Sequence, residues 1–464
     1  MAPSATFNRG LALLVAATAF MEFLDGTVIQ TAAPAMARDF GVTAADLNVA
    51  ITVYLLALAV CIPATGWLAD RFGTRRVYLV SIVAFTAASV LCAFAPSLIW
   101  LCVFRALQGI GGAMMVPVGR LAVLRAVDKR DLLDAMAYLT WPALLAPVIA
   151  PAIGGVLTDT VGWRWIFLIN VPIGVAALIA ALSLVPRADE LRPVSLDWAG
   201  LGYIAVALAA LVIAGELVGE APTDWTAVIV ALLATAVSGY LAALRLRRAA
   251  YPVLDLRALR IDTFRVGNVG GGVYRLMISA VPFLVTLLFQ AGFGWSAAKA
   301  GLIVIALFIG NLGIKPATTP LIKRFGFRTV IVWSNVIGAV ILLLLVLVGP
   351  ATPIVVTIVL LVASGAFRSI GFSAYNTIQF VDVPSELTNG ANTLASTMQQ
   401  VATGLGIAVA ALLVRLGTGL AASVTDGGGW LGYRWAFVGA ALLLLIPLIE
   451  AVRMPVHAGL AATE

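Results

Sequence analysis

Fourteen apolar stretches, each long enough to cross a lipid bilayer as a helix, determine what this chain can fold into. A helix rises about 1.5 Å per residue, so roughly 20 apolar residues are needed to span about 30 Å of hydrocarbon. The predicted spans are 11–35, 48–68, 77–95, 98–121, 136–157, 164–185, 198–217, 226–246, 268–290, 300–320, 329–348, 353–375, 392–415 and 434–452. The sequence therefore predicts an all-α protein that crosses a membrane many times.

The composition fits a membrane protein and leaves little room for an enzyme. Apolar residues make up 62% of the 464 residues and charged residues 11%, which is far from the balance of soluble domains. His457, the single histidine, lies in the polar tail, and Cys61, Cys92 and Cys102 fall in apolar runs. These residues offer no metal site, disulfide framework or histidine-based catalytic triad. Because a GxxxxGK[ST] phosphate loop is also absent, we expect no enzymatic activity, cofactor, metal or direct use of ATP.

The positions of the 29 lysines and arginines predict which side of the membrane each loop faces, because cytoplasmic loops retain positive charge during insertion. With the N-terminus inside, nineteen lie in cytoplasmic segments: Arg9, Arg71, Arg75, Arg76, Arg125, Lys129, Arg130, Arg187, Arg192, Arg245, Arg247, Arg248, Arg257, Arg260, Arg265, Lys323, Arg324, Arg328 and Arg453. Five lie outside: Arg38, Arg164, Lys299, Arg415 and Arg434. The remaining five lie within spans. This excess predicts that both termini are cytoplasmic, and it assigns the net charge of +7 to topology rather than to nucleic-acid binding.

The chain contains an internal repeat. Residues 40–77 align without gaps on residues 293–330, an offset of 253, and thirteen of the 38 positions are identical. A second pair, WRWIF at 163–167 and YRWAF at 433–437, opens the last span of each half. Repeats in the same orientation predict two six-helix bundles that move against each other around a midplane site. We predict an N-terminal bundle over 1–190, an inserted helix pair with a cytoplasmic linker over 191–255, and a C-terminal bundle over 256–464.

The first span carries two carboxylates, in the sequence MEFLDGT at 21–27. A charge at the bilayer centre costs about 2.5–3.5 kcal/mol on insertion scales, so we expect Glu22 and Asp25 to face a water-accessible cavity. Because they are three residues apart, they share a helix face. Two close carboxylates at low dielectric disfavour double ionisation, so we expect at least one to hold a proton near neutral pH. This suits proton coupling; the alternative is a pair of packing acids satisfied by Arg105 or by backbone groups.

Cations are predicted inside the spans of the second half, at Arg275, Lys315 and Arg368. Arg275 is the repeat counterpart of Glu22, so we hypothesise that the two face each other across a central cavity. The alternative for Arg275 and Lys315 is snorkelling or packing within the C-terminal half. The predicted substrate cavity comprises these side chains and further polar ones: Glu22, Asp25, Gln108, Arg275, Gln290, Asn311, Lys315, Asn376 and Gln379.

Four stretches have the form of known transporter motifs: LDGTVIQTAAP at 24–34, GWLADRFGTRR at 66–76, LCVFRALQGIGGA at 101–113 and APVIAPAIGG at 146–155. In this order the chain resembles the major facilitator superfamily, specifically its fourteen-helix drug:proton antiporter family, over most of its length. Two departures occur. Ala146 and Ala150 replace glycines of the helix-five antiporter motif, and Gln30 and Thr31 stand where helix one usually has a more apolar, asparagine-containing stretch.

The resemblance implies a major facilitator fold of two six-helix bundles plus an extra central helix pair, with roles for the motif residues. Arg105 would join Glu22 and Asp25 in proton coupling. A conformational latch on a tight cytoplasmic turn would use Gly66, Asp70, Arg71, Gly73, Arg75 and Arg76. Asp70 and the three arginines would pair with helix ends or with each other, the alternative for the arginines being purely topogenic charge. A bendable helix between the halves would use Pro147, Pro151, Gly154 and Gly155, the alternative being ordinary small-residue packing.

Together with the embedded acids, the resemblance implies a bacterial inner-membrane antiporter that exports lipophilic or cationic organic compounds, such as drugs or biocides, in exchange for protons. Its expected partners are a small-molecule substrate, protons and the lipid bilayer, with no nucleic acid, and the need for a periplasmic adaptor stays open. The embedded cations leave open an exporter of an organic anion or metabolite. A third alternative is a non-transporting membrane receptor or scaffold, which would keep its function after Asp25→Asn.

Overall fold

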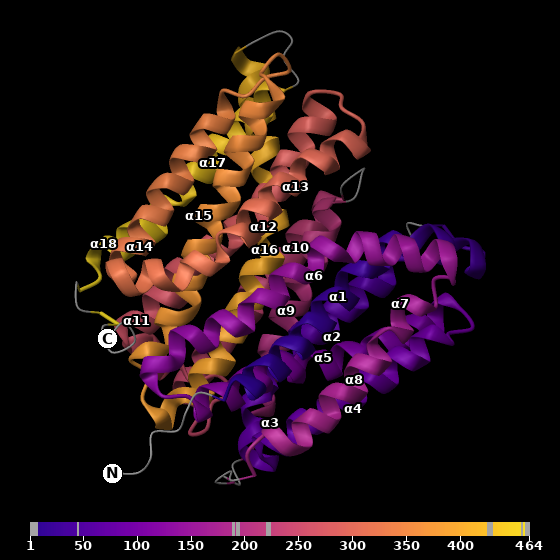
Figure 1. Ribbon diagram of the computed structural model, residues 1–464, viewed down its shortest axis with the longest axis vertical. Coiled ribbons are helices and arrows are strands. Elements are labelled where there is room, and N and C mark those ends of the chain that lie inside the picture. Colours follow the sequence, from indigo (N-terminus) through magenta and orange to yellow (C-terminus); the bar gives the residue numbers. More distant parts are fainter. Residues whose placement is uncertain are drawn as a thin grey trace. The chain divides into compact units, whose positions relative to one another are not determined.

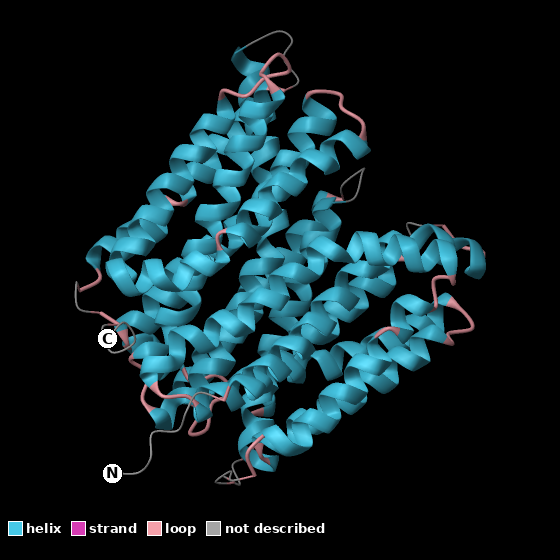
Figure 2. Cartoon of the chain, viewed as in Figure 1, coloured by secondary structure: helices cyan, strands magenta, loops and turns pink. Residues whose placement is uncertain are grey.

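The computed structural model describes residues 8–43, 46–187, 191, 195–219, 224–424, 430–455 and 458–459, with no side-chain description at 142–144, 147, 219, 297, 298, 407 and 421–424. Within these ranges every regular element is a helix, and no strand occurs (Figure 2). The predicted all-α class is confirmed. His457 of the polar tail and Arg192 of the predicted cytoplasmic segments lie outside the described residues.

The first of two compact units comprises Met1–Ile213, Ile229–Leu256 and Pro384–Thr397. Its elements are α1 (Arg9–Phe40), α2 (Asn48–Cys61), η1 (Ile62–Ala64), α3 (Thr65–Phe72), α4 (Thr74–Ala93), α5 (Leu98–Ala126), η2 (Lys129–Asp131), α6 (Leu132–Thr160), α7 (Trp165–Leu168), α8 (Asn170–Leu184), most of α9 (Trp198–Gly219) and α10 (Trp225–Arg248), η6 (Ser385–Leu387) and the start of α16 (Thr388–Val424). Within it α1 packs on α6 (Figure 1), and α4 contacts both α5 and α8.

The second unit comprises Ala214–Val228, Arg257–Val383 and Met398–Glu464. Its elements are most of η3 (Leu256–Arg260), α11 (Asp262–Arg265), η4 (Val266–Gly270), α12 (Gly271–Leu287), η5 (Leu288–Gly292), α13 (Ala297–Gly313), α14 (Lys315–Val346), α15 (Ile354–Val381), the rest of α16, α17 (Leu431–Leu443) and α18 (Leu445–Arg453). Here α15 packs on α13 and on α14, and α14 also contacts α17 and α18. The predicted division at residues 190 and 255 stays a prediction.

Among the described residues, twelve helices are long and apolar enough to cross a membrane. They are Arg9–Phe40, Asn48–Phe72, Thr74–Ala93, Leu98–Ala126, Trp165–Leu184, Trp198–Val218, Trp225–Arg248, Asp262–Gly292, Lys315–Val346, Ile354–Val381, Ser385–Leu420 and Leu431–Arg453. Two shorter apolar helices, Val148–Thr160 and Lys299–Gly313, fall on the other two predicted spans. The chain is therefore a multi-pass membrane protein, while the full count of fourteen stays a prediction.

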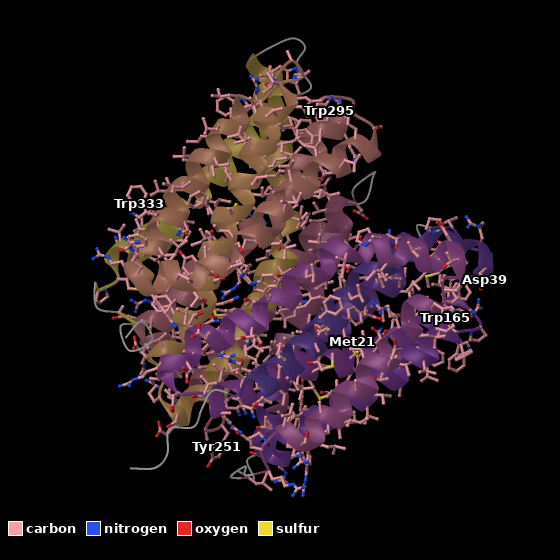
Figure 3. All side chains as sticks on the ribbon, viewed as in Figure 1. Met21, Asp39, Trp165, Tyr251, Trp295 and Trp333 are labelled. Carbon is pink, nitrogen blue, oxygen red and sulfur yellow. The ribbon has the colours of Figure 1, made fainter. Side chains whose placement is uncertain are left out.

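Large apolar side chains point outward from both units, as expected for surfaces in contact with lipid. Val80, Leu302 and Val355 are 61%, 71% and 66% exposed. Trp333 of α14 is 57% exposed and is seen on the outside of the second unit (Figure 3). In a water-soluble protein these surfaces would form apolar patches far larger than a monomer normally exposes.

The internal repeat reappears in the backbone. Gly41 and its counterpart Gly294 have φ of 68° and 67°, and Gly73 and Gly326 have φ of 88° and 75°. These values lie in a region that only glycine adopts at little cost. Both halves therefore reverse or kink the chain at equivalent positions, and the predicted tight turn at Gly73 is confirmed.

The second helix of each half also breaks at the same repeat position. In the first half α2 ends at Cys61 and a 3₁₀ turn begins at Ile62. In the second half α13 ends at Gly313 and α14 begins at Lys315, the counterpart of Ile62. The predicted span 300–320 is thus divided and Lys315 lies on α14, because Pro316 has no N–H to continue α13 and instead suits the first turn of a new helix.

The α13–α15 contact is so close that it requires glycine. A Cβ on Gly365 would lie 1.8 Å from the Leu307 carbonyl oxygen, and one on Gly109, in the equivalent α2–α5 contact, would lie 2.6 Å from the Tyr54 carbonyl oxygen. We therefore expect Gly365→Ala to lower stability by about 1–3 kcal/mol or more, since the helices must separate. Thermal unfolding in detergent measures this effect. Gly301→Ala on α13 is the matched control because no atom lies within 4 Å of its added Cβ, and an equal loss in both variants would contradict the prediction.

Candidate functional site

Asp25 of α1 forms a buried ion pair with Arg105 of α5. The Arg105 Nη1 lies 2.5 Å from Asp25 Oδ2, and both side chains are fully buried. Two further donors, Gln108 Nε2 and Asn170 Nδ2, each lie 2.8 Å from Asp25 Oδ1. Because both carboxylate oxygens accept hydrogen bonds from protein donors, the Asp25 side chain is held in place.

This hydrogen-bond network joins four helices of the first unit. Gln108 Oε1 accepts from Arg105 Nη1 at 2.8 Å, and Ser89 Oγ of α4 accepts from Asn170 Nδ2 at 2.9 Å and from Gln108 Nε2 at 3.2 Å. Ser89 in turn donates to the Phe167 carbonyl at 3.0 Å. Sequence reasoning missed Ser89 and Asn170. The available signal was a lone asparagine in an apolar run, directly after WRWIF and Leu168–Ile169.

The charge of Arg105 is further stabilised by aromatic rings. Its guanidinium carbon lies 4.0 Å from the centre of the Tyr54 ring and 5.9 Å from that of Phe167. Its Nε and Nη2 have no hydrogen-bond partner, so the ring faces replace the acceptors that water would supply. Arg105 is thus fixed by one carboxylate, one amide and two rings, as a structural centre of the first unit.

Glu22, one turn before Asp25 on α1, has a different environment. Its side chain is buried, with 9% exposure, and its Oε2 has no hydrogen-bond partner. It approaches α5 at Gly112, where an added Cβ would lie 3.5 Å from its carboxyl carbon. The Tyr54 hydroxyl is also buried without a partner. Burying an ionised carboxylate without a donor costs far more free energy than burying a neutral carboxylic acid. Glu22 therefore lacks the partners that stabilise the charge of a carboxylate, whereas Asp25 has them.

Among its described residues, the second unit holds three buried cations, Arg275, Lys315 and Arg368. Arg275 donates to the Gly267 carbonyl at 3.0 Å, to Asn376 Oδ1 at 2.7 Å and to Gln379 Oε1 at 3.3 Å. Three residues of the predicted cavity therefore come together here, with Gln379 and Asn376 one turn apart on α15. Lys315 and Asn311 are buried elsewhere in the same unit, whereas Gln290 is exposed and joins none of these contacts. Glu22 and Arg275 lie in different units, and their pairing stays a hypothesis.

The predicted latch has a partner that the sequence did not reveal. Asp70 lies 3.4 Å from Arg125 at the end of α5, and Arg125 also donates to Thr74 Oγ1 at 2.7 Å. The turn at Gly73 is thereby tied to α5. Arg71 and Arg76 are exposed and have no acidic partner among the described residues, which fits the topogenic alternative for these two arginines.

Arg75 contacts a helix end, as predicted, and the repeat copies this contact. Arg75 donates to the Leu182 carbonyl near the end of α8. Its counterpart Arg328 donates to the Val452 carbonyl near the end of α18 at 2.8 Å. A cation at a helix C-terminus satisfies a free carbonyl and interacts favourably with the helix dipole. Each half therefore fastens its third helix to its last one with an equivalent arginine.

Gly66 contacts the start of α16, which belongs to the first unit. Asn389 Nδ2 donates to the Gly66 carbonyl at 2.9 Å, and a Cβ on Gly66 would lie 2.4 Å from Thr393 Oγ1. Deeper along the same helix face, Asn392 receives a hydrogen bond of 2.7 Å from Arg120 Nε, and Ser396 receives one of 2.5 Å from Arg120 Nη2. This polar face was not predicted, although its spacing of three and four residues could be read from the sequence.

The sequence that forms these helices matches the model of a known protein family over most of its length. The model of the Major Facilitator Superfamily matches residues 15–248 and 268–457. The chain belongs to the Major Facilitator Superfamily. This membership places it among membrane transporters rather than enzymes, as the sequence analysis expected.

Relatives of this superfamily member carry a common name. This chain is 34% identical over 445 residues to "Putative multidrug resistance protein MdtD" of Pectobacterium atrosepticum, and the alignment covers 95% of both chains. It is 35% identical over 448 residues to the protein of that name from Klebsiella pneumoniae, covering 96% of this chain and 94% of the relative. The crystal structure of the human organic anion transporter MFSD10 (TETRAN) has the same fold, with a TM-score of 0.64, 16% identity and 95% and 97% coverage.

The antiporter-motif helix of this superfamily member, α6, runs unbroken from Leu132 to Thr160. A Cβ on Gly154 would lie 2.1 Å from Thr31 Oγ1 of α1, whereas one on Gly155 would meet no atom within 4 Å. Close packing at Gly154 therefore joins α6 to α1 of the same unit. Pro151 is exposed, and the side chain of Pro147 lies outside the described residues. The bendable role of this helix stays a prediction.

Proposed function

We propose that this protein is a proton-coupled exporter of lipophilic organic compounds, of the fourteen-helix drug:proton antiporter type, that works by alternating access. The observation that carries the proposal is Glu22: a buried carboxyl with an unpartnered oxygen, one turn from an acid that is fully paired. Two acids on one helix face thus have two roles. Glu22 carries the proton, and Asp25 fixes Arg105 and the four helices around it.

The relatives named for multidrug resistance support the substrate class. A protein of this class would reside in the bacterial inner membrane with both termini in the cytoplasm, and would export drugs or biocides. Glu22 favours compounds with a positive charge. The buried cations of the second unit favour an anionic group, which keeps organic-anion export as the second candidate function.

The free energy released by proton entry is large enough to drive the export of such a compound. One proton entering down roughly 100 mV and one pH unit releases about 3.7 kcal/mol, enough for a gradient on the order of 500-fold. If a monovalent cation leaves for each proton, the exchange is electroneutral, and only the pH term of about tenfold remains. Because Asp25 forms an ion pair with Arg105, we propose that Glu22 alone carries a proton, so that one proton is transported in each cycle.

Proton movement in inverted membrane vesicles tests this function. The vesicles carry a preformed, acidic-inside pH gradient, and a panel of lipophilic cations, zwitterions and anions is added one compound at a time. We expect at least one compound to release protons from vesicles that contain this protein and not from vesicles that lack it. A panel in which compounds are transported without any proton release would contradict the proposal.

A further inference from the structure

The seam between α13 and α15 differs in polarity from its counterpart in the first half, although the two pack in the same way. Gly109 contacts Tyr54 and Leu58 across the α2–α5 seam, and Gly365 contacts Leu307 and Asn311 across the α13–α15 seam. From these equivalent contacts, four pairs of positions correspond: Leu58 and Asn311, Ile62 and Lys315, Ala113 and Ser369, and Pro117 and Ser373. All four first-half residues are buried and apolar. The packing of this helix pair therefore does not require polar side chains.

In the second half these positions form a buried polar seam, defined here as Asn311, Lys315, Ser369 and Ser373. Lys315 is 3% exposed, and its ammonium group lies 2.7 Å from Ser373 Oγ. The Ser369 hydroxyl and the Asn311 Oδ1 are buried without a hydrogen-bond partner. Buried polar groups in native proteins are nearly always paired, and unpaired ones are costly. The protein alone therefore does not satisfy all the hydrogen-bonding groups of the polar seam.

The charge of the seam is also uncompensated. Helices α12, α13, α14 and α15 contain no aspartate or glutamate. Among the described residues, Lys315 forms no ion pair with a carboxylate. Nor does Arg368 of α15, whose Nη2 donates to the Ile278 carbonyl while its Nε and Nη1 remain buried without a partner. Phe372, one turn after Arg368 on α15, lies 5.8 Å from the Lys315 ammonium.

We propose that the polar seam, together with Arg368, binds the carboxylate of a lipophilic substrate. A carboxylate offers several lone pairs in one plane. These lone pairs suit the Nε and Nη1 of Arg368 and the Ser369 hydroxyl, which lack acceptors, and the Lys315 ammonium, whose one printed acceptor is Ser373 Oγ. The Asn311 Oδ1 is itself an acceptor and is not a partner for the carboxylate. The half-buried ring of Phe372 offers an apolar surface to the body of such a compound. Arg275 is not part of this site, because both of its Nη groups already donate to Asn376, Gln379 and the Gly267 carbonyl.

The inference rests on the proposed export function and names a substrate class for it, an organic carboxylate. The repeat supplies the most informative variant. Lys315→Ile installs the residue that the first half carries at the equivalent position, so it should pack without a void. Since it also removes a buried charge that has no counter-ion, it should raise thermal stability if the lysine serves a ligand rather than the fold.

Binding of radiolabelled 1-naphthoate to the full-length protein in detergent, by equilibrium dialysis against empty micelles, tests the site. The neutral isostere 1-naphthamide is the matched probe. Lys315→Arg keeps the charge, and Lys299→Met removes an exposed lysine of the same unit. Lys315→Ile and Arg368→Met should each weaken 1-naphthoate binding about tenfold or more, with 1-naphthamide unchanged. Lys315→Arg and Lys299→Met should stay within a few-fold of wild type.

Three results would overturn the inference. The first is 1-naphthoate binding that Lys315→Ile leaves unchanged, and the second is no 1-naphthoate binding by the wild type. The third is a fall in the unfolding temperature of Lys315→Ile, which would make the lysine a structural cation. Failure of the export proposal gives a different pattern, because charge-dependent binding would persist while no compound releases protons from vesicles. Proton release by cations without 1-naphthoate binding would keep the export proposal and reject the seam as an anion site.

Discussion

Glu22→Gln is expected to abolish proton-driven transport while leaving the protein folded and able to exchange substrate. The amide has the shape of the protonated acid but cannot release a proton, so a pH gradient no longer drives accumulation. The expected effect is the loss of the entire gradient that the pH term supports, about tenfold per pH unit. Accumulation of a transported compound in inverted vesicles measures it, alongside the exchange of labelled for unlabelled compound at equal pH.

Glu216→Gln is the matched control for this variant. Glu216 is also a carboxyl within an apolar helix, α9, but it is exposed and lies outside the hydrogen-bond networks described above. It should therefore transport like wild type. If Glu22→Gln still accumulated its substrate in response to pH, the proton would have to be carried by another group.

Asp25→Asn is expected to destabilise the protein far more than Glu22→Gln does. Its neutral amide leaves the Arg105 guanidinium buried without a counter-ion, and breaking a buried ion pair in this way costs about 3–5 kcal/mol. Glu22→Gln removes no ion pair and should change the unfolding free energy by less than about 1 kcal/mol. Unfolding in detergent can be followed by labelling of the buried Cys92 thiol with a thiol-reactive dye as temperature rises.

A second substitution at Arg105 distinguishes a lost charge pair from a general packing defect. Adding Arg105→Gln to Asp25→Asn removes the uncompensated guanidinium, so the double variant should recover part of the lost stability. Equal stability of the Asp25→Asn and Glu22→Gln variants would show that the two acids do not have the distinct roles assigned to them.

The fold could largely be predicted because its main signals are local. Apolar length gives the spans, and the repeat predicts equivalent turns, as Gly73 and Gly326 show. Helix ends were harder. The break before Lys315 depends on Pro316, and it is equivalent to the break before the 3₁₀ turn at Ile62. Apolar length alone predicted one continuous span that ended at residue 320.

The site could be predicted only in part, because pairing depends on which helices meet. The sequence brought Glu22, Asp25 and Arg105 together, but it could not assign Arg105 to Asp25 alone. That assignment depends on Ser89 and Asn170, which lie on α4 and α8 and look like ordinary small polar residues in the sequence. Similarly, Asp70 was expected to pair with a helix end or with the arginines of its own motif, and its partner, Arg125, lies 55 positions later.

Infrared difference spectroscopy on reconstituted protein tests most directly whether Glu22 holds the exchanged proton. The added substrate is the compound that releases the most protons in the vesicle panel. In the wild type, we predict that substrate removes one C=O stretching band of a protonated carboxylic acid, a band that shifts in D₂O. That band should be absent from Glu22→Gln and unchanged in Glu216→Gln. A wild-type spectrum without the band, or a Glu22→Gln spectrum that retains it, would contradict the assignment of proton coupling to Glu22.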